Sequence, residues 1–488
     1  MKRTLETLRA DAAAGVDGIS PRVLKLRDLT SIIVDLLNSH CCLGGDPSAV
    51  APLHLRSTAL DNQRGIAIGC AAAKLLNAAL LNRLLQRLDP ILLGAQSGFR
   101  PGRSAVEQIC TLRAVIDGCK TRQRTVSIVF VDFRKAFDSV SRSAIAKVLQ
   151  LYGVPPQLVN AIMDLYCDTT AFVQTSHGPT EQFRTSSGVL QGDTLAPVLF
   201  IVVVDYVLRR CLHESKSFLL RSRRSARHPA IPLPALAYAD DIALLCRDPD
   251  SAQHALTRLC EEAARVGLLI NAKKTEVLHV GCQTPTDLIL PGGEPVTQCH
   301  EFKYLGSQVI SPEAIITSRR AQAWRASHLL RKIFNSSARD DSKVRLISAA
   351  VEPILLYGLE AIPITATREK DVDALYSALL RNALGVHYPT LISSRDLMSR
   401  VGVPPLSITL RRRRQRLLGH CLRSHNRDNA IPLAMAILHP PSERLRRGQA
   451  HTQTLLQTFL QDLAHLHLTP QTTLSCPSSL FSQRVRAN

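Results

Sequence analysis

Two apolar segments with carboxylates at their ends are the most informative pattern in the chain. Residues 125–133, TVSIVFVDF, are almost entirely apolar and β-branched, which predicts a central strand buried on both faces. Because strand side chains alternate, Ile128, Phe130 and Asp132 share one face. Asp132 is therefore predicted at the carboxyl end of a buried strand, where sheets often place chemistry. A structural Asp that caps a loop is the alternative.

The second segment, residues 235–245, reads ALAYADDIALL. Its two apolar runs predict a strand, a tight turn and a second strand, with Asp240 and Asp241 at the tip. Adjacent carboxylates repel each other, and burying them unpaired is costly. A hard divalent cation would resolve this conflict, whereas the alternative is a solvated Asp-Asp turn. A second strand that carries Asp132 favours the cation.

The other periodic segments are mainly helical. Apolar residues recur at helical spacing over 71–88, 104–118, 141–152, 155–168, 251–266, 318–334, 341–359 and 369–384. Residues 171–186 predict a hairpin, and 268–280 and 301–309 predict further strands. The longest apolar run, 196–204, is too short to span a bilayer and predicts a core helix. The fold class predicted is α+β with a mainly helical C-terminal region.

Three loops or runs carry candidate binding groups. QSGFRPGR, residues 96–103, presents two arginines that suit phosphate contacts, or only a solvated basic turn. SGVLQGDTLAP, residues 187–197, opens into a helix whose amides could face a ligand, or is a simple turn. The arginines of 411–416 indicate a nucleic-acid contact, a nuclear address or a solvated face. The last thirty residues are rich in Thr, Gln, Ser and His, and we expect them to be poorly ordered.

The net charge of the chain indicates the class of its binding partner, and its cysteine content indicates the cellular compartment. The net charge is +20 and the pI about 9.8, which favours a polyanion, with nucleic acid as the first candidate and a membrane surface as the weaker one. The 13 cysteines include no CxxC pair, so neither a zinc ribbon nor a disulfide scaffold is indicated. The N-terminus lacks the apolar core of a signal peptide. We expect an intracellular protein, nuclear or cytoplasmic, that is not secreted and does not enter a membrane.

Eight motifs in order make the chain recognisable. They are AGVDGIS, NQRGIAI, QSGFRPGRS, VFVDFRKAFDSV, SGVLQGDTLAPVLF, YADDIALL, GLLINAKKTEVL and FKYLGS. Together they resemble the reverse transcriptase of non-LTR (LINE-type) retrotransposons. The resemblance covers about residues 8–460 and is strongest from 61 to 309. It implies a right-hand polymerase with fingers, palm and thumb.

The resemblance also implies domain boundaries. Residues 1–124 would form an N-terminal segment and fingers. Residues 36–310 would form a reverse transcriptase domain of fingers and palm that overlaps this segment. Residues 311–390 would form a helical thumb. Residues 391–488 would form a basic region whose tail is expected to be disordered.

The implied activity is RNA-directed DNA polymerisation. Asp132, Asp240 and Asp241 would hold two Mg²⁺ ions, with Mn²⁺ as an alternative, as in other two-metal sites. The primer 3′-hydroxyl would attack the α-phosphate of a dNTP on an RNA template and release pyrophosphate. The implied partners are an RNA template, a DNA primer and dNTPs.

Further residues take implied roles from their motifs. Phe137 matches the steric gate that excludes a ribose 2′-hydroxyl, and packing under the strand is its alternative role. Lys274 matches a lysine near the leaving pyrophosphate, where it could stabilise charge or donate a proton. The remaining nucleotide contacts would be Arg64, Gln191 and Gly192. Template contacts would come from Arg100 and Arg103, and the primer grip from Phe302, Tyr304, Leu305 and Gly306.

The chain also departs from the family pattern. The fingers motif begins near residue 12, so we expect no endonuclease before it, and one could act in trans. The stretch RRGQAHTQTLLQTFLQDL looks like a drifted copy of a family motif. The alternative function is therefore a catalytically silent relic or a maturase-like RNA-binding protein of the same fold. The sequence leaves the oligomeric state open.

Overall fold

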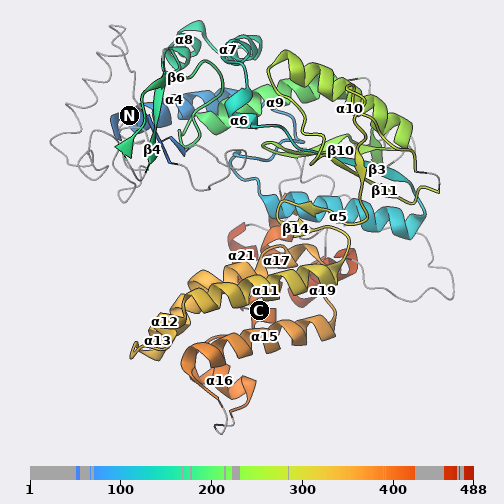
Figure 1. Cartoon of the computed structure of the whole chain (residues 1–488). Helices are drawn as coiled ribbons and strands as arrows, with labels where there is room; N and C mark the ends of the chain where they lie inside the picture. The colour runs from blue at the N-terminus through green and yellow to red at the C-terminus, as the bar shows by residue number, and fades with distance from the viewer. Residues whose placement is uncertain are drawn as a thin grey trace.

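The computed structural model describes most of the chain from residue 51 onward. The described residues are 51–54, 66–67, 71–167, 169–175, 178–213, 216–221, 231–283, 285–387, 390, 392–423, 455–469, 472 and 478–487. Figure 1 shows a sheet with its covering helices at one end and a group of helices at the other, with α5 (Ala105–Arg122) running between them.

The central sheet has five strands in the order β12-β11-β3-β10-β9. These are β12 (Thr297–Gln298), β11 (Glu276–Val280), β3 (Val126–Val131), β10 (Asp241–Cys246) and β9 (Ala235–Tyr238). β3 pairs antiparallel with both β10 and β11, and all six of its residues are buried. The predicted buried central strand is therefore confirmed.

Two apolar cores meet at this sheet, which explains why β3 is apolar on both faces. Val129 and Val131 belong to the first core, beneath five helices: α4 (Ala71–Leu88), α7 (Arg142–Leu151), α8 (Pro156–Asp164), α9 (Ala196–Leu212) and α10 (Pro249–Arg265). Ile128 and Phe130 belong to the second core, which includes residues of α5. The alternation of side chains along one strand thus holds both layers together.

Smaller strands complete the sheet end of the molecule. β1 (Ala51–His54), β2 (Ile66–Ala67), β4 (Thr170–Thr175), β5 (Gly178–Pro179) and β6 (Phe183–Arg184) form a second sheet. β4 pairs antiparallel with β5 and β6, as the hairpin predicted over 171–186 requires. β7 (Phe218–Arg221) pairs with β8 (Ile231–Leu233), and β13 (Lys303–Tyr304) pairs with β14 (Ser307–Gln308).

A third core is purely helical and spans Ile315 to Leu410. Its elements are α11 (Pro312–Leu329), α12 (Arg331–Phe334), α13 (Asp340–Leu346), the π-helix η2 (Ile347–Val351), α14 (Glu352–Leu356), the 3₁₀-helix η3 (Leu359–Ala361), α15 (Ala366–Leu384), α16 (Ser394–Arg400) and the start of α17 (Leu406–Arg423). The domain boundary predicted at residue 390 therefore falls inside this core. The single helix predicted over 341–359 is interrupted at η2, just before Pro353, which lacks the N–H of a regular helix.

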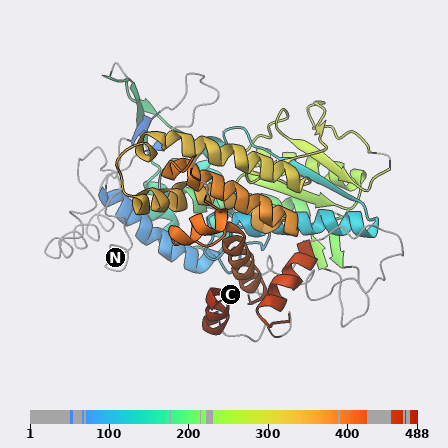
Figure 2. The same ribbon diagram turned by 90° about the horizontal axis from the view of Figure 1, so that it is seen from below.

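The C-terminal helices α19 (Leu455–His465) and α21 (Ser478–Ala487) pack against α17 (Figure 2). Phe459, Leu463, Phe481 and Val485 are buried in the second core beside residues of β3 and α5. In this region, where the sequence led us to expect poor order, the described residues form two helices with buried apolar side chains. Their apolar side chains pack against an apolar face of α17, a contact that the sequence pattern did not predict.

Four arginines of the basic run at 411–416 contact other parts of the protein, whereas Arg416 is exposed. Arg414 is buried and binds Asp462 with two hydrogen bonds of 2.7 and 3.0 Å. Arg411 contacts Glu369 at 3.3 Å, Arg413 lies 3.6 Å from Glu360, and Arg412 donates to the carbonyl of Arg486. The contacts of these four arginines therefore stabilise the fold, a role that none of the three alternatives for this run had included.

No helix in the described part of the chain combines the length and hydropathy needed to cross a bilayer.

Candidate active site

The carboxylate turn lies between β9 and β10. Tyr238 pairs with Asp241, which leaves Ala239 and Asp240 as a two-residue hairpin turn. Ala239 has a φ of 59° and Asp240 is not among the positive-φ residues, the pattern of a type II′ turn. The predicted strand, turn and strand are confirmed, with Asp241 as the first residue of β10.

The strand register brings Asp132 to this turn. Ile242 of β10 pairs with Val131 of β3, so continuing the register by one residue places Asp241 opposite Asp132. Directly opposed residues in antiparallel strands have Cβ atoms about 4.5–5.5 Å apart. The register thus places Asp241 opposite Asp132, with Asp240 in the adjoining turn, at one end of two neighbouring strands.

The donor set at this edge fits Mg²⁺ bound in part by other molecules. Within the described part of the chain, no three or more His, Cys, Asp or Glu side chains form a group that could hold a metal ion. Mg²⁺ is commonly bound through one or two carboxylates together with substrate phosphates and water. Asp132 is half-buried and Asp241 exposed, so both can be reached from solvent. The carboxylates therefore suit an ion completed by substrate.

The turn of residues 271–275 forms hydrogen bonds with Asp132, on the side of β3 opposite to β10. Asn271 donates its backbone N–H to the Asp132 carbonyl at 2.8 Å and its side-chain amide to Oδ2 at 3.2 Å. The Asp132 N–H reaches the buried Thr275 hydroxyl at 3.4 Å. Lys274 Nζ lies 4.0 Å from Asp132 Oδ2. Lys274 was singled out from the sequence, whereas Asn271 and Thr275, which flank it in the same motif, were missed.

The predicted gate, Phe137, lies in a small aromatic cluster. It follows Asp132 in the short helix α6 (Ala136–Ser139) and is half-buried. Its ring stacks on Phe200 with centroids 4.4 Å apart and meets Phe99 edge-on at 6.4 Å. The Phe137 ring is therefore packed against other aromatic rings and is also partly exposed, so the packing role and the gate role are compatible.

The loop of Gln191 and Gly192 is tied to the turn that carries Phe137. Val189 donates its N–H to the Phe137 carbonyl at 2.7 Å. Gly188 lies so close to Asp138 that a Cβ there would sit 2.5 Å from the Asp138 carbonyl oxygen. The structure thus brings the predicted nucleotide loop and the predicted gate together.

Asp193 anchors the far side of that loop, a role the sequence had not indicated. Its carboxylate accepts from the Asn77 amide at 2.5 Å and from the Tyr166 hydroxyl at 3.1 Å. Burial raises the pKa of Asp193, against these hydrogen bonds, which lower it. Gly192 has a φ of 108°, a conformation that L side chains rarely adopt. The loop is therefore fixed to α4 and to the turn that follows α8.

The predicted primer grip is a tight turn held by the helical region. Tyr304 pairs with Ser307, and Leu305 and Gly306 between them have φ values of 47° and 77°, as in a type I′ turn. The Tyr357 hydroxyl donates to the Leu305 carbonyl at 2.8 Å. Arg319 donates to the Gly306 carbonyl at 2.6 Å, and its guanidinium lies 4.7 Å from the centroid of the Tyr357 ring.

Two of the predicted grip residues pack inward. The Phe302 ring stacks on Phe130 with centroids 3.7 Å apart. Tyr304 is 2% exposed and also contacts the Phe130 ring, so the proposed direct contact of Tyr304 with nucleic acid is corrected to a core position. Phe130 stands two residues before Asp132 on the same face of β3. The grip turn is thereby packed beneath the carboxylates, and Leu305 and Gly306 remain at the surface side of the turn.

Arg100, predicted to contact the template, is buried in the structure. It is 7% exposed, and its Nε atom binds the Asp89 carboxylate at 2.8 Å. Its other nitrogens donate to the carbonyls of Asp89, Leu93 and Gln96. These bonds hold the buried Arg100 guanidinium inside the loop, in place of the template contact predicted from the sequence. Arg103 is half-buried just before α5, and Arg64 lies outside the described residues.

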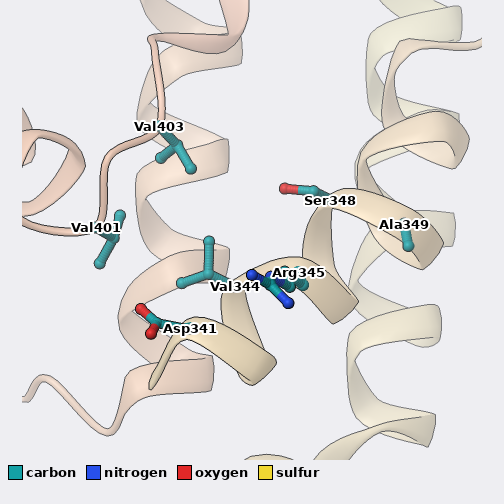
Figure 3. A pocket seen from close by; sticks show the side chains of 7 residues that line it. All are labelled: Asp341, Val344, Arg345, Ser348, Ala349, Val401 and Val403. Atoms are coloured by element: carbon teal, nitrogen blue, oxygen red, sulfur yellow. The ribbon is translucent and has the colours of Figure 1, made fainter. Parts of the chain in front are cut away.

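A surface cleft of about 500 Å³ lies in the helical region, away from the carboxylates (Figure 3). Its lining side chains come from α13, η2 and the residues after α16: Asp341, Val344, Arg345, Ser348, Ala349, Val401 and Val403. None of them belongs to the motifs above. The polar end of the central sheet, not this cleft, is the candidate active site.

Comparison with known proteins supports this assignment. Residues 55–309 match the family described as reverse transcriptase (RNA-dependent DNA polymerase). The chain belongs to this family. The match spans the central sheet, the turn of Asp240 and Asp241 and the grip turn, so the polymerase fold predicted from the sequence is confirmed.

Curated relatives identify the branch of the family. The chain is 27% identical over 456 residues to a Popillia japonica protein named "Retrovirus-related Pol polyprotein from type-1 retrotransposable element R2", covering 90% of this chain and 61% of that protein. It is 26% identical over 324 residues to the Drosophila melanogaster protein of the type-2 element R2DM, covering 64% of this chain and 28% of that protein. The predicted resemblance to non-LTR retrotransposon reverse transcriptases is confirmed. The chain spans about three fifths of the first of these relatives.

A solved structure of apo telomerase from Candida tropicalis, truncated from its C-terminal domain, also aligns with the chain. It has 11% sequence identity and a TM-score of 0.39, and the alignment covers 59% of each chain. A likeness of this size carries no argument about function.

Proposed function

We propose that this chain extends a primer 3′-hydroxyl with dNTPs on an RNA template, as the polymerase of a non-LTR retrotransposon. The observation that carries the proposal is the convergence of Asp132 with Asp240 and Asp241 at one end of two paired strands, beside Lys274. Asp132, Asp240 and Asp241 would hold two Mg²⁺ ions, with Mn²⁺ as an alternative. Such ions stabilise the attacking and leaving oxygens of an in-line displacement.

The surrounding residues supply position and charge. Phe137 limits the space beside the sugar, because its ring is held by Phe200 and Phe99. Gln191 and Gly192 lie against the incoming nucleotide, on a loop that Asp193 fixes. Lys274 faces the triphosphate, where its ammonium offsets the charge that develops on pyrophosphate. Most of the rate enhancement would then come from positioning and from charge neutralisation.

The proposal includes the parts of a right hand. The central sheet would be the palm and the sheet of β1, β2 and β4 part of the fingers, with Arg64 among the triphosphate contacts of the fingers. The helices of the third core would be the thumb, which lies along the primer–template duplex. Leu305 and Gly306 would contact the primer strand from the grip turn, and Arg103 would contact the template.

Nucleic acid is the expected polyanionic partner of a chain with net charge +20. Each phosphate neutralised adds roughly 0.9 to the slope of log affinity against log salt on duplex DNA, so binding should weaken steeply with salt. An endonuclease acting in trans and an intracellular location, nuclear or cytoplasmic, are part of the same proposal.

The test is primer extension by the purified protein on an RNA template annealed to a DNA primer, with dNTPs and Mg²⁺. Asp240→Asn removes one negative ligand and should abolish extension while template binding persists. Asp371→Asn, at an exposed position of α15, is the matched control and should extend like the parent. Template binding without extension by the parent would instead favour the silent relic or maturase-like protein.

A further inference from the structure

The loop of residues 95–98 extends the central sheet at the edge of β9. Ala237 donates its N–H to the Ala95 carbonyl at 2.9 Å, and Ser97 donates to the Ala237 carbonyl at 2.8 Å. These bonds form a parallel bridge between Gln96 and Ala237. The loop therefore reaches the catalytic hairpin through backbone contacts, two residues before the strained Ala239.

The Gln96 side chain continues this contact to the turn itself. It is completely buried, and its Oε1 atom accepts from the N–H groups of Ala239 and Gly98, each at 2.9 Å. Its Nε2 atom donates to the Ala239 carbonyl at a longer 3.4 Å. One side chain thus binds both backbone polar groups of Ala239, the residue that directly precedes Asp240.

Ala239 is a position where such support has a physical reason. Its φ of 59° lies in the left-handed region, which is unfavourable for a residue that carries a Cβ. The backbone of Gly98 packs closely against the same peptide. A Cβ at residue 98 would sit 2.3 Å from the Ala239 nitrogen, which is too close for any side chain. Only glycine permits this approach, and the approach brings Gln96 within reach of the turn.

We propose that Gln96 is a positioning residue for Asp240 and Asp241, an inference that rests on the proposed polymerase function. Gln96 contacts neither carboxylate. It holds the backbone of Ala239 so that the two carboxylates keep a fixed relation to Asp132 on the neighbouring strand. Because a displacement of about 1 Å can reduce a rate about a hundredfold, loosening the turn should act on turnover more than on substrate binding.

The first experiment uses Gln96→Met, which keeps the length of the side chain and removes its hydrogen bonds. Amide hydrogen exchange of the peptide that contains Ala239 should become faster, because its N–H loses its acceptor. The kcat for primer extension should fall by about ten- to a hundredfold, while KM for the primer–template stays within about twofold of the parent. Gln96→Glu keeps the two accepting bonds and should restore slow exchange.

Gln415→Met is the matched control. Gln415 is as completely buried as Gln96 and donates to the Asp462 carbonyl at 3.0 Å, in the C-terminal helices. It should match Gln96→Met in any loss of thermal stability and leave exchange at the turn and kcat unchanged. If Gln96→Met does not fold, Gln96→Asn, whose shorter side chain withdraws the amide from Ala239, provides the same comparison.

Parent-like exchange at the turn in Gln96→Met or Gln96→Asn would overturn the inference, as would faster exchange in these variants with an unchanged kcat. The failure of the proposed function is a different result. In that case the parent itself would extend no primer, whatever the exchange at the turn.

Discussion

The ammonium of Lys274 lies 4.0 Å from Oδ2 of Asp132. Lys274 comes just before β11 and Asp132 just after β3, and the antiparallel pairing of these strands brings the two positions to the same edge of the sheet. The Lys274 side chain is 67% exposed, and an ion pair that open contributes little to folding. The contact is therefore better explained by chemistry than by stability. It places a proton donor and a positive charge beside the carboxylate that we propose as a metal ligand.

Replacing Lys274 should consequently affect turnover. We predict that Lys274→Ala lowers kcat by roughly a hundredfold, the lower end of what a positioned acid contributes, with the melting temperature unchanged. Single-turnover extension at saturating dNTP measures the effect. Lys273→Ala removes the adjacent exposed lysine and should leave kcat unchanged. Equal losses in both variants would exclude a specific role for Lys274.

Phe137 should set the choice of sugar. In Phe137→Ala the ring that stacks on Phe200 is lost, and space opens for a 2′-hydroxyl. We predict that incorporation of ribonucleotides relative to deoxyribonucleotides rises by about tenfold or more. Measuring the ratio within one protein cancels any loss of stability, and Phe183→Ala, at an exposed position of β6, is the control. An unchanged ratio would leave Phe137 with the packing role alone.

Local patterns predicted the parts of the site that depend on local geometry. The alternation of side chains between the two faces of β3 and the turn before Asp241 depend on residues close together in the sequence. The structure contains both the buried strand and the turn. Arg100 could not be assigned in this way, because its partners, the Asp89 carboxylate and three carbonyls, are chosen by the path of the loop. The contact of Gln96 could not be predicted for a different reason, because its partner Ala239 lies 143 residues away in the sequence.

The C-terminal region shows a second limit. Its polar composition predicted disorder, yet Phe459, Phe481 and Val485 are buried against residues of α5 and β3. A few apolar side chains at helical spacing are enough when a distant element offers them a surface. The composition of a segment does not reveal whether such a surface exists.

Tyr357 links the helical region to the grip turn and should affect how the primer is held. Tyr357→Phe removes only the hydroxyl that donates to Leu305 at 2.8 Å. We predict a several-fold higher KM for the primer–template and shorter extension products, with a stability loss of about 1 kcal/mol. Products under conditions of single binding provide the measurement.

Tyr376→Phe is the matched control for that experiment. Tyr376 is buried in α15, and its hydroxyl interacts with Ser348, far from the turn. It should cost similar stability without changing product length. Shortened products in both variants would indicate a general weakening of the helical region instead of a specific hold on the grip turn.

The buried pair of Arg414 and Asp462 should make the C-terminal helices part of the cooperative fold. Both side chains are at most 3% exposed, and they share hydrogen bonds of 2.7 and 3.0 Å. Removing one partner of such a pair leaves a buried charge and typically costs about 3–5 kcal/mol. We therefore predict that Asp462→Ala markedly lowers the urea midpoint of unfolding, whereas Arg414→Met combined with Asp462→Leu recovers most of the loss.

Glu261→Ala serves as the comparison, because it breaks an exposed pair with Arg258 at 2.9 Å and should cost under about 1 kcal/mol. If α19 were only loosely attached, Asp462→Ala would unfold like Glu261→Ala, and the double variant would bring no recovery. A large loss that the double variant reverses would instead show that residues near the C-terminus stabilise the same core as Phe130 of β3, the strand that Asp132 directly follows.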